Sequence, residues 1–189
     1  MRLNKAANAG RAPLDERGLD LYETPGIAVE ALLRVERLPR VVWEPACGPG
    51  SIVRYLRAHR ISVVATDLVD YECPRSAGGF DFLKLQRPPP DCHCIITNPP
   101  YKDATAFVRQ ALKLVPRVVM LLRLAFLESE RRSDILDGGR LRRVHVFAKR
   151  LPMMHRAGWT GPRAVSAIAF AWFVWCGEKG PTTIDRIKI

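Results

Sequence analysis

The strongest constraint on the fold is a strand, a glycine turn, a helix and a second strand in direct succession. An apolar run at 40–43 leads into Glu44-Pro45-Ala46-Cys47-Gly48-Pro49-Gly50, and a helical apolar pattern follows at 52–56. A second apolar run, 61–66, ends at Asp67, about 20 residues after the glycine turn. This spacing is typical of a βαβ unit that binds a nucleotide, so we predict parallel strands with a ligand at their carboxyl ends.

The remaining chain continues the alternation of strands and helices. Further strands are predicted at 93–97, 118–124, 144–148 and 168–175. Helices are predicted from Pro25, with Thr24 as the cap, to the region of Leu38-Pro39, then over 104–112 and over 128–136. The pattern predicts an α/β fold: a mainly parallel sheet with helices on both faces and a C-terminal antiparallel strand.

Length and hydropathy favour one globular domain. The chain has 189 residues, which suits a single domain over 21–189 preceded by a flexible N-terminal tail over 1–20. No apolar run is long enough to cross a membrane, and the first 20 residues lack the apolar segment of a secretory signal. We therefore expect a cytoplasmic protein without a membrane partner.

The cysteines favour free thiols in a reducing compartment, because their number is odd and their spacing is unlike that of a disulfide scaffold. They are Cys47, Cys73, Cys92, Cys94 and Cys176. Alternation along a strand would place Cys92 and Cys94 on one face, but no second Cys/His pair completes a zinc site. We expect buried thiols and no metal.

Positive charge is concentrated in the second half of the chain. The net charge is +11; 13 basic and 12 acidic residues precede Lys102, whereas 17 and 7 lie from Lys102 onward. Such an imbalance favours a polyanionic partner on that side of the protein, and nucleic acid is the leading candidate.

The tetrapeptide Asn98-Pro99-Pro100-Tyr101 follows the predicted strand 93–97. An amide, two prolines and an aromatic ring at a strand's carboxyl end form a rigid turn that holds acceptors beside a flat stacking surface. A planar ligand with an amino group fits such a turn.

In this order of motifs, the sequence resembles the S-adenosylmethionine-dependent N6-adenine DNA methyltransferases, with the cofactor loop before the catalytic tetrapeptide. Tyr22-Glu23-Thr24-Pro25 looks like the family's N-terminal cofactor segment, Glu44 to Gly50 its glycine loop, Asp67 its ribose acid and Asp81-Phe82 its adenine contact. The resemblance implies a Rossmann-like class I methyltransferase fold and covers roughly residues 20 to 125.

The resemblance also assigns catalytic roles. The Asn98 side-chain oxygen and the Pro99 carbonyl would accept the two hydrogens of the adenine amine and aim its lone pair at the cofactor methyl group. Tyr101 would stack on the target base after it has left the helix. This chemistry needs no metal.

The same resemblance implies a cofactor site for S-adenosylmethionine and its product S-adenosylhomocysteine. Gly48 and Gly50 would allow close backbone approach, and Glu44 would orient the loop or face the methionine ammonium. The full set is Thr24, Pro25, Glu44, Ala46, Gly48, Gly50, Asp67, Asp81, Phe82 and Asn98.

The substrate is less constrained, because sequence-specific members of the family usually carry a separate target-recognition domain. The candidate nucleic-acid-contacting insert is 127–165, and its candidate contacts are Arg131, Arg132, Arg142, Arg143 and Trp159. We predict methylation of adenine N6 in DNA, at a specific site. Methylation of RNA adenine and N5-methylation of a protein glutamine remain alternatives, and a partner protein or a homodimer would be a source of recognition.

Overall fold

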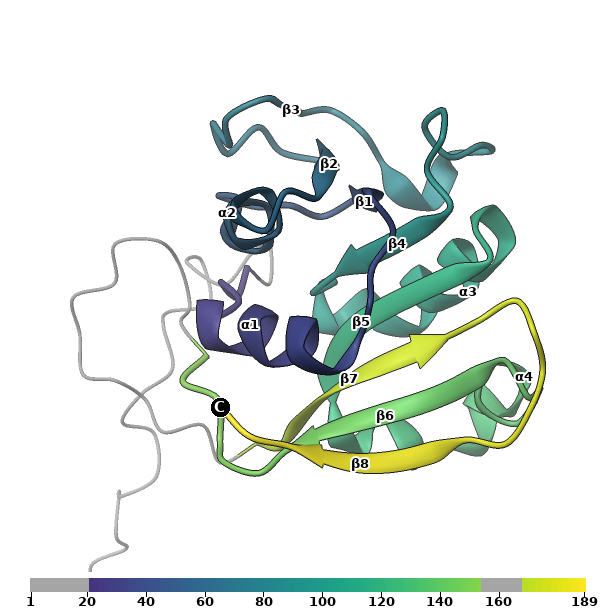
Figure 1. Ribbon diagram of the computed structural model, residues 1–189. Coiled ribbons are helices and arrows are strands. Elements are labelled where there is room, and N and C mark those ends of the chain that lie inside the picture. Colours follow the sequence, from purple (N-terminus) through teal and green to yellow (C-terminus); the bar gives the residue numbers. More distant parts are fainter. Residues whose placement is uncertain (1–20, 154–167) are drawn as a thin grey trace, which may run out of the picture.

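The computed structural model describes residues 21–153 and 168–189, which share one twisted sheet (Figure 1). Its order is β3-β2-β1-β4-β5-β7-β6-β8. The strands are β1 (Val41–Glu44), β2 (Ser62–Thr66), β3 (Ser76–Ala77), β4 (Cys94–Thr97), β5 (Arg117–Arg123), β6 (Leu141–Phe147), β7 (Phe170–Trp175) and β8 (Thr183–Ile187). Strands β3 to β5 in this order are parallel, β7 is antiparallel to both of its neighbours, and β8 is parallel to β6. The predicted fold class, including the C-terminal antiparallel strand, is confirmed.

Helices cover both faces of the sheet (Figure 1). Helices α1 (Gly26–Val35) and α2 (Ser51–Ala58) pack on one face, and α3 (Ala104–Leu114) and α4 (Ser133–Leu136) pack on the other. Short 3-10 helices, η1 (Phe82–Lys84), η2 (Tyr101–Asp103), η3 (Leu124–Leu127) and η4 (Glu130–Arg132), lie in the connections.

Strand β7 is buried on both faces, and its side chains alternate between the two helix layers. Trp172 packs in the α1 and α2 layer and its indole N–H donates to the Ala28 carbonyl at 2.9 Å. Trp175 packs in the opposite layer and donates to the Ile135 carbonyl at 2.8 Å. Both tryptophans are core residues, as predicted, and their hydrogen bonds tie each helix layer to the same strand.

Three sequence predictions differ from the structure near the helices. Pro25 is the N-cap and Gly26 the first residue of α1; the Thr24 side chain forms no cap, and its carbonyl instead accepts the Ser51 hydroxyl. Helix α1 ends at Val35, short of the predicted Leu38-Pro39. The predicted helix over 128–136 is two short pieces, η4 and α4.

Two strands were not predicted from the sequence. Strand β3 has only two residues and lies in a segment that reads as a loop. Strand β8 lies at the edge of the sheet and is exposed except at Ile187, so it lacks the apolar pattern that marks a buried strand.

The cysteine prediction was right about burial and wrong about the faces. All five cysteines are free thiols, and Cys92 and Cys94 are buried. Strand β4 begins only at Cys94, and Cys92 packs in the α3 layer whereas Cys94 packs in the α1 layer. Within the described residues, no group of three or more His, Cys, Asp or Glu side chains is arranged to hold a metal ion.

In the described part of the chain, no helix has the length and apolar character needed to cross a membrane.

A buried ionic cluster lies at the amino ends of the strands. The carboxylate of Glu36, which follows α1, binds Arg117 at 2.6 Å, His145 at 2.9 Å and the guanidinium of Arg143. Burial by itself raises the pKa of Glu36, but His145, Arg143 and Arg117 outweigh it and lower that pKa to about 2. The cluster joins the end of α1 to β5 and β6.

The predicted nucleic-acid contacts Arg142 and Arg143 also lie at this edge of the sheet. The register pairs Leu141 with Trp175 and Trp175 with Val118, so Arg142 and Arg143 lie at the amino end of the sheet. Arg143 is held by Glu36, and Arg142 donates to the carbonyls of a neighbouring loop. Both side chains have structural partners at the edge opposite the carboxyl ends.

Replacing Glu36 by Gln is expected to lower the free energy of unfolding by about 3 kcal/mol at pH 7, because the Arg143 and Arg117 guanidinium groups lose their buried anion. The contribution of a carboxyl with a lowered pKa is present above its unfolded value of 4.5 and is lost as the pH falls toward about 2. Denaturant unfolding at a series of pH values should therefore show the two proteins converging on acidification. Glu30→Gln, which removes an exposed pair with His59, is the control and should change stability little; an equal loss in both variants would contradict the cluster's role.

Candidate active site

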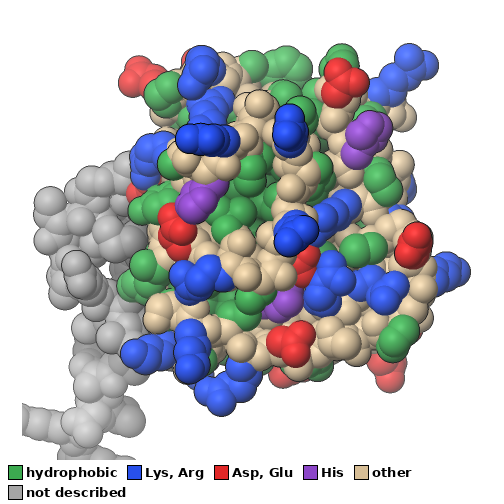
Figure 2. Space-filling model, viewed as in Figure 1, with side chains coloured by type: hydrophobic (Ala, Val, Ile, Leu, Met, Phe, Trp, Pro, Cys, Tyr) green, Lys and Arg blue, Asp and Glu red, His purple; other side chains and the backbone are tan. Residues whose placement is uncertain are grey.

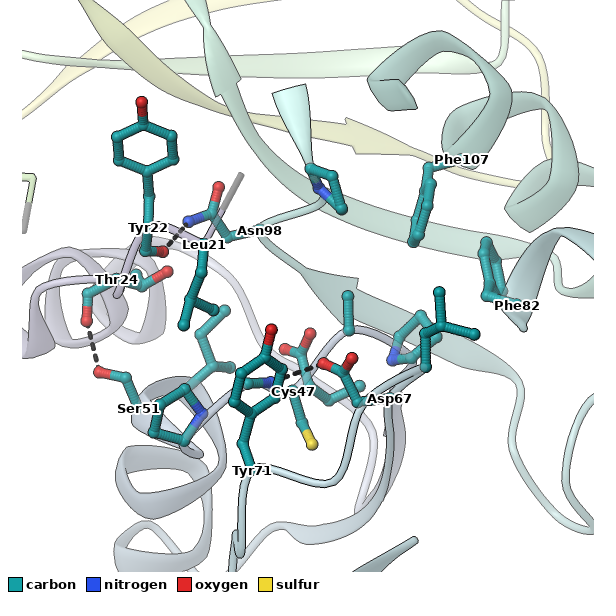
Figure 3. A pocket seen from close by; sticks show the side chains of 18 of the residues that line it. Leu21, Tyr22, Thr24, Cys47, Ser51, Asp67, Tyr71, Phe82, Asn98 and Phe107 are labelled. Atoms are coloured by element: carbon teal, nitrogen blue, oxygen red, sulfur yellow. Dashed lines mark hydrogen bonds between the residues drawn. The ribbon is translucent and has the colours of Figure 1, made fainter. Parts of the chain in front are cut away.

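A pocket opens at the carboxyl ends of β1, β2 and β4 (Figure 3). Its walls come from the segment before α1, the glycine loop after β1, the loop after β2, η1 and the turn after β4. Figure 3 shows Tyr22 and Asn98 on one side, Phe82 and Phe107 on another, and Asp67 with Cys47 between them. This is the edge at which ligands bind in open parallel sheets.

Asp67 joins the loops after β1 and β2. Its Oδ2 accepts the Gly48 amide at 2.8 Å and its Oδ1 accepts the Val69 amide at 3.1 Å. Burial raises the pKa of Asp67, and these backbone hydrogen bonds oppose the rise. The carboxylate is therefore held in one position in the pocket wall, and each oxygen keeps a lone pair for a ligand hydroxyl.

Glu44 ends β1 in the pocket wall and is 1% exposed. Among the described residues, neither oxygen of its carboxyl group has a hydrogen bond of normal length and angle, although the Thr97 hydroxyl and the Ala46 amide lie near it. Burial raises the pKa of Glu44 well above its ordinary value, the neighbouring Thr97 hydroxyl and Ala46 amide oppose this in part, and the charge of Asp67 adds to it. A buried carboxyl without a donor is costly, so the site suits a ligand that brings a cation or N–H groups.

The tetrapeptide after β4 forms a fixed turn. The Asn98 amide donates from Nδ2 to the Tyr22 carbonyl at 2.9 Å, and its Oδ1 is buried without a partner among the described residues. Pro99 is buried, and Pro100 is the N-cap of η2 with a φ of −51°. The hydrogen bond to Tyr22 fixes the orientation of the amide and leaves its oxygen as an acceptor.

Tyr101 lies beside this pocket, with its ring among other aromatic rings. Its ring centroid is 4.9 Å from that of Tyr22 and 5.6 Å from that of Phe170, and the Arg123 guanidinium carbon is 4.7 Å from it. Phe170 and Arg123 carry no signal in the sequence for this position, because they come from β7 and β5, which the fold brings beside the tetrapeptide.

The predicted adenine contacts, Asp81 and Phe82, both line the pocket, and each also has partners within the protein. Asp81 caps η1 by accepting the Leu83 amide at 3.1 Å, and it pairs with Lys84 at 3.0 Å. Phe82 is 2% exposed, and its ring centroid lies 5.3 Å from that of Trp43 and 4.9 Å from that of Phe107. Most of the Phe82 side chain therefore packs in the core.

Exposed apolar side chains of the pocket come from its rim instead. They are Leu68 (58% exposed), Phe80 (42%) and Leu83 (39%). Together with Tyr71 they offer apolar surface at the pocket rim that could cover a planar ring, in addition to the predicted Phe82. Leu68 and Phe80 lie in the segment between β2 and η1, and Leu83 lies within η1.

Of the other predicted cofactor-binding residues, some line the pocket and some lie behind it. Gly48 lies in the pocket wall, as do Thr24, Ala46 and Asn98, whereas Pro25 and Gly50 support it from behind as the N-caps of α1 and α2.

Of the remaining nucleic-acid candidates, Arg131 and Arg132 do not line the pocket. Arg132 donates to the Phe126 carbonyl at 2.7 Å and to the Thr105 hydroxyl at 3.2 Å, and its guanidinium lies over the Phe126 ring. Arg131 is exposed, and Trp159 lies outside the described residues. Figure 2 shows Lys and Arg side chains spread over the face that is seen in Figure 1. The net charge alone therefore does not locate a binding surface. In the described part of the predicted insert, 127–153, strand β6 belongs to the central sheet.

No protein-family model matches the sequence, and no curated protein matches it. Solved structures do match in fold. A modification subunit of a putative type I restriction enzyme from Vibrio vulnificus is 14% identical, with a TM-score of 0.63, over 89% of this chain and 47% of that one. This chain therefore spans about half the length of that subunit.

Two further structures cover most of the chain. A putative RNA methyltransferase from Pyrococcus horikoshii is 14% identical, with a TM-score of 0.58, over 88% of this chain and 90% of that one. A dimethyladenosine transferase from Plasmodium falciparum is 15% identical, with a TM-score of 0.54, over 82% of this chain and 62% of that one. At these identities the comparisons establish the fold alone, which is the Rossmann-like fold of these structures.

Gly50, the N-cap of α2, allows a test of whether the glycine loop requires a residue without a side chain. Its φ of +88° is left-handed, and an added Cβ would lie 2.5 Å from the Cys73 sulfur. Gly79 has a similar φ of +80° with nothing within 4 Å of such an atom. Gly79→Ala should therefore cost about 1 kcal/mol of stability from backbone strain alone.

Gly50→Ala should cost about 1–3 kcal/mol more than Gly79→Ala, because its methyl group must displace Cys73. Denaturant unfolding of both variants and of the double variant Gly50→Ala with Cys73→Ala checks the cause. The double variant should show less than the summed losses. Additive losses would mean that the two side chains do not compete for one space.

Proposed function

We propose that this protein transfers a methyl group from S-adenosylmethionine to the exocyclic N6 amine of adenine in DNA. The observation that carries the proposal is Asn98: its Nδ2 is fixed on the Tyr22 carbonyl while its buried Oδ1 lacks a partner among the described residues. A buried acceptor held in this way beside a pocket suits a planar amine that arrives with two N–H groups.

The residues present fit the cofactor. The partnerless carboxyl of Glu44 suits the methionine ammonium, because a cation there favours the charged form that burial disfavours. Asp67 is held by the Gly48 amide in a position to accept ribose hydroxyls, and Leu68 and Phe80 offer the apolar rim for its purine. When bound, S-adenosylmethionine supplies an electrophilic methyl group on sulfur.

The chain's own residues would then orient the nucleophile. Asn98 Oδ1 and the Pro99 carbonyl accept the two hydrogens of the amine, which pulls its lone pair out of conjugation and aims it at the methyl carbon. The N–C bond would form as the S–C bond of S-adenosylmethionine breaks, and the amine would give up one proton to solvent. Tyr101, among aromatic neighbours, offers a stacking surface to the extruded base.

DNA is preferred because the sequence resembles DNA adenine enzymes and the Vibrio neighbour is described as a restriction modification subunit. RNA adenine is the second candidate, since the Pyrococcus neighbour is described as a putative RNA methyltransferase and spans nearly the same length. N5-methylation of a protein glutamine would use the same acceptor geometry on a planar amide.

Asn98→Ala is expected to lower the rate of methyl transfer about 100-fold or more, because the amine loses an oriented acceptor. Labelled S-adenosylmethionine should be supplied with duplex DNA, single-stranded DNA, RNA and a glutamine-containing release factor, followed by nucleoside analysis for N6-methyladenine. Gln86→Ala, which removes an exposed amide, is the matched control and should retain full activity. Label found only in protein would exclude the nucleic-acid proposal, and undiminished transfer by Asn98→Ala would exclude the role of Asn98.

Asp67→Ala is expected to weaken S-adenosylhomocysteine binding about 10- to 100-fold, because it removes both the ribose acceptor and the anchor of the Gly48 amide. Isothermal titration calorimetry measures this without any methyl acceptor. Asp70→Ala, an exposed carboxylate in the same loop, should bind as the wild type does. Equal affinities for all three proteins would remove Asp67 from the cofactor site.

A further inference from the structure

Arg123 ends β5 at the same edge of the sheet as the pocket. The strand register places it opposite Phe170, the residue that begins β7 and packs near the Tyr101 ring. Its guanidinium carbon lies 4.7 Å from the centroid of Tyr101. A cation thus covers the aromatic residue of the tetrapeptide.

Arg123 has no fixed polar partner among the described residues, unlike several other arginines of the second half of the chain. Arg109 pairs with Asp134, Arg117 and Arg143 bind Glu36, and Arg140 donates to backbone carbonyls. Within residues 21–153 and 168–189, Arg123 takes part in no ion pair, and its side chain is exposed. Its charge therefore remains available to a ligand.

Its contact with Tyr101 is also easy to exchange. Phe170 is buried and Tyr22 packs against the core, so neither can leave the Tyr101 ring without exposing apolar surface. An exposed cation–π contact is weak, because water competes for the cation. Arg123 can therefore swing away from the ring at small cost, and a base that stacks on Tyr101 would replace its contact.

The surface beside Arg123 has the same sign. Strand β6 ends at Phe147 on the same edge, and Lys149 and Arg150 follow it directly. Both are exposed, and neither takes part in an ion pair within the described part of the chain. A row of available cations past the ends of β5 and β6 suits a chain of phosphates.

We infer that Arg123 is a substrate-positioning residue that binds a phosphate next to the target adenosine as the base stacks on Tyr101. The inference rests on the proposed function and deepens it, because it places the nucleic-acid backbone at the carboxyl ends of β5 and β6. Phosphate contacts of this kind fix the position of a strand without reading its sequence.

The test compares Arg123→Gln and Arg123→Lys with Arg37→Gln, an exposed arginine between α1 and β1 whose side chain has no fixed partner. Substrates are short single strands with one adenine in randomised flanks. Arg123→Gln should raise KM about tenfold and reduce the slope of log affinity against log salt by about 0.7, the value for one single-strand phosphate. The KM and the salt slope of Arg123→Lys should lie between those of Arg123→Gln and the wild type. Those of Arg37→Gln should match the wild type.

A neutral methylphosphonate, placed in turn on the 5′ and the 3′ side of the adenine, identifies the phosphate. At one of these positions it should weaken wild-type binding about tenfold and have almost no further effect on Arg123→Gln, because the partner of the phosphate is already gone. Fully additive losses at both positions, or equal KM values for Arg123→Gln and Arg37→Gln, would overturn the inference.

Two controls separate this inference from the proposed function. S-adenosylhomocysteine affinity and the unfolding midpoint should be unchanged in Arg123→Gln, since Arg123 is exposed and does not line the cofactor pocket. A wild-type protein that methylates none of the nucleic acids would defeat the proposed function itself. Methylation by the wild type without any effect at Arg123 would defeat only the inference.

Discussion

Burial of both faces of the sheet is the constraint on which the rest of the structure depends. Trp172 and Trp175 lie on opposite faces of β7, and each gives its indole N–H to a different helix layer. Both faces of the inner strands are covered by apolar side chains, and the buried carboxyl groups of Glu36 and Glu44 lie at the two opposite edges formed by the strand ends.

The buried carboxyl groups at the two edges have pKa values shifted in opposite directions. At the amino ends, Glu36 is surrounded by Arg117, Arg143 and His145, and its pKa is lowered to about 2. At the carboxyl ends, Glu44 is buried without a partner among the described residues, and its pKa is raised. The first arrangement is complete and stabilises the fold, whereas the second becomes favourable only when a ligand supplies the missing donors.

The same division explains which arginines are available to a substrate. Sequence reasoning chose Arg142 and Arg143 because they lie in the basic half of the chain, but β6 places both at the edge with the ion cluster. Arg123 ends β5, and the antiparallel pairing with β7 brings it beside Phe170 and Tyr101. A count of charges along the sequence does not separate paired from available arginines. Arg143, for example, is neutralised by Glu36, which lies 107 residues away in the chain.

The sequence by itself determined the βαβ unit, the parallel core of the sheet and the positions of Glu44, Asp67 and Asn98 at strand ends, because local periodicity and turn residues fix these features. It gave no signal for β8, whose exposed residues form a strand only by pairing with β6. Only the tertiary structure decided that Phe82 packs mainly in the core, that Leu68 and Phe80 form the apolar rim, and that Arg123 covers Tyr101. These outcomes depend on contacts between segments distant in the chain, which no local pattern encodes.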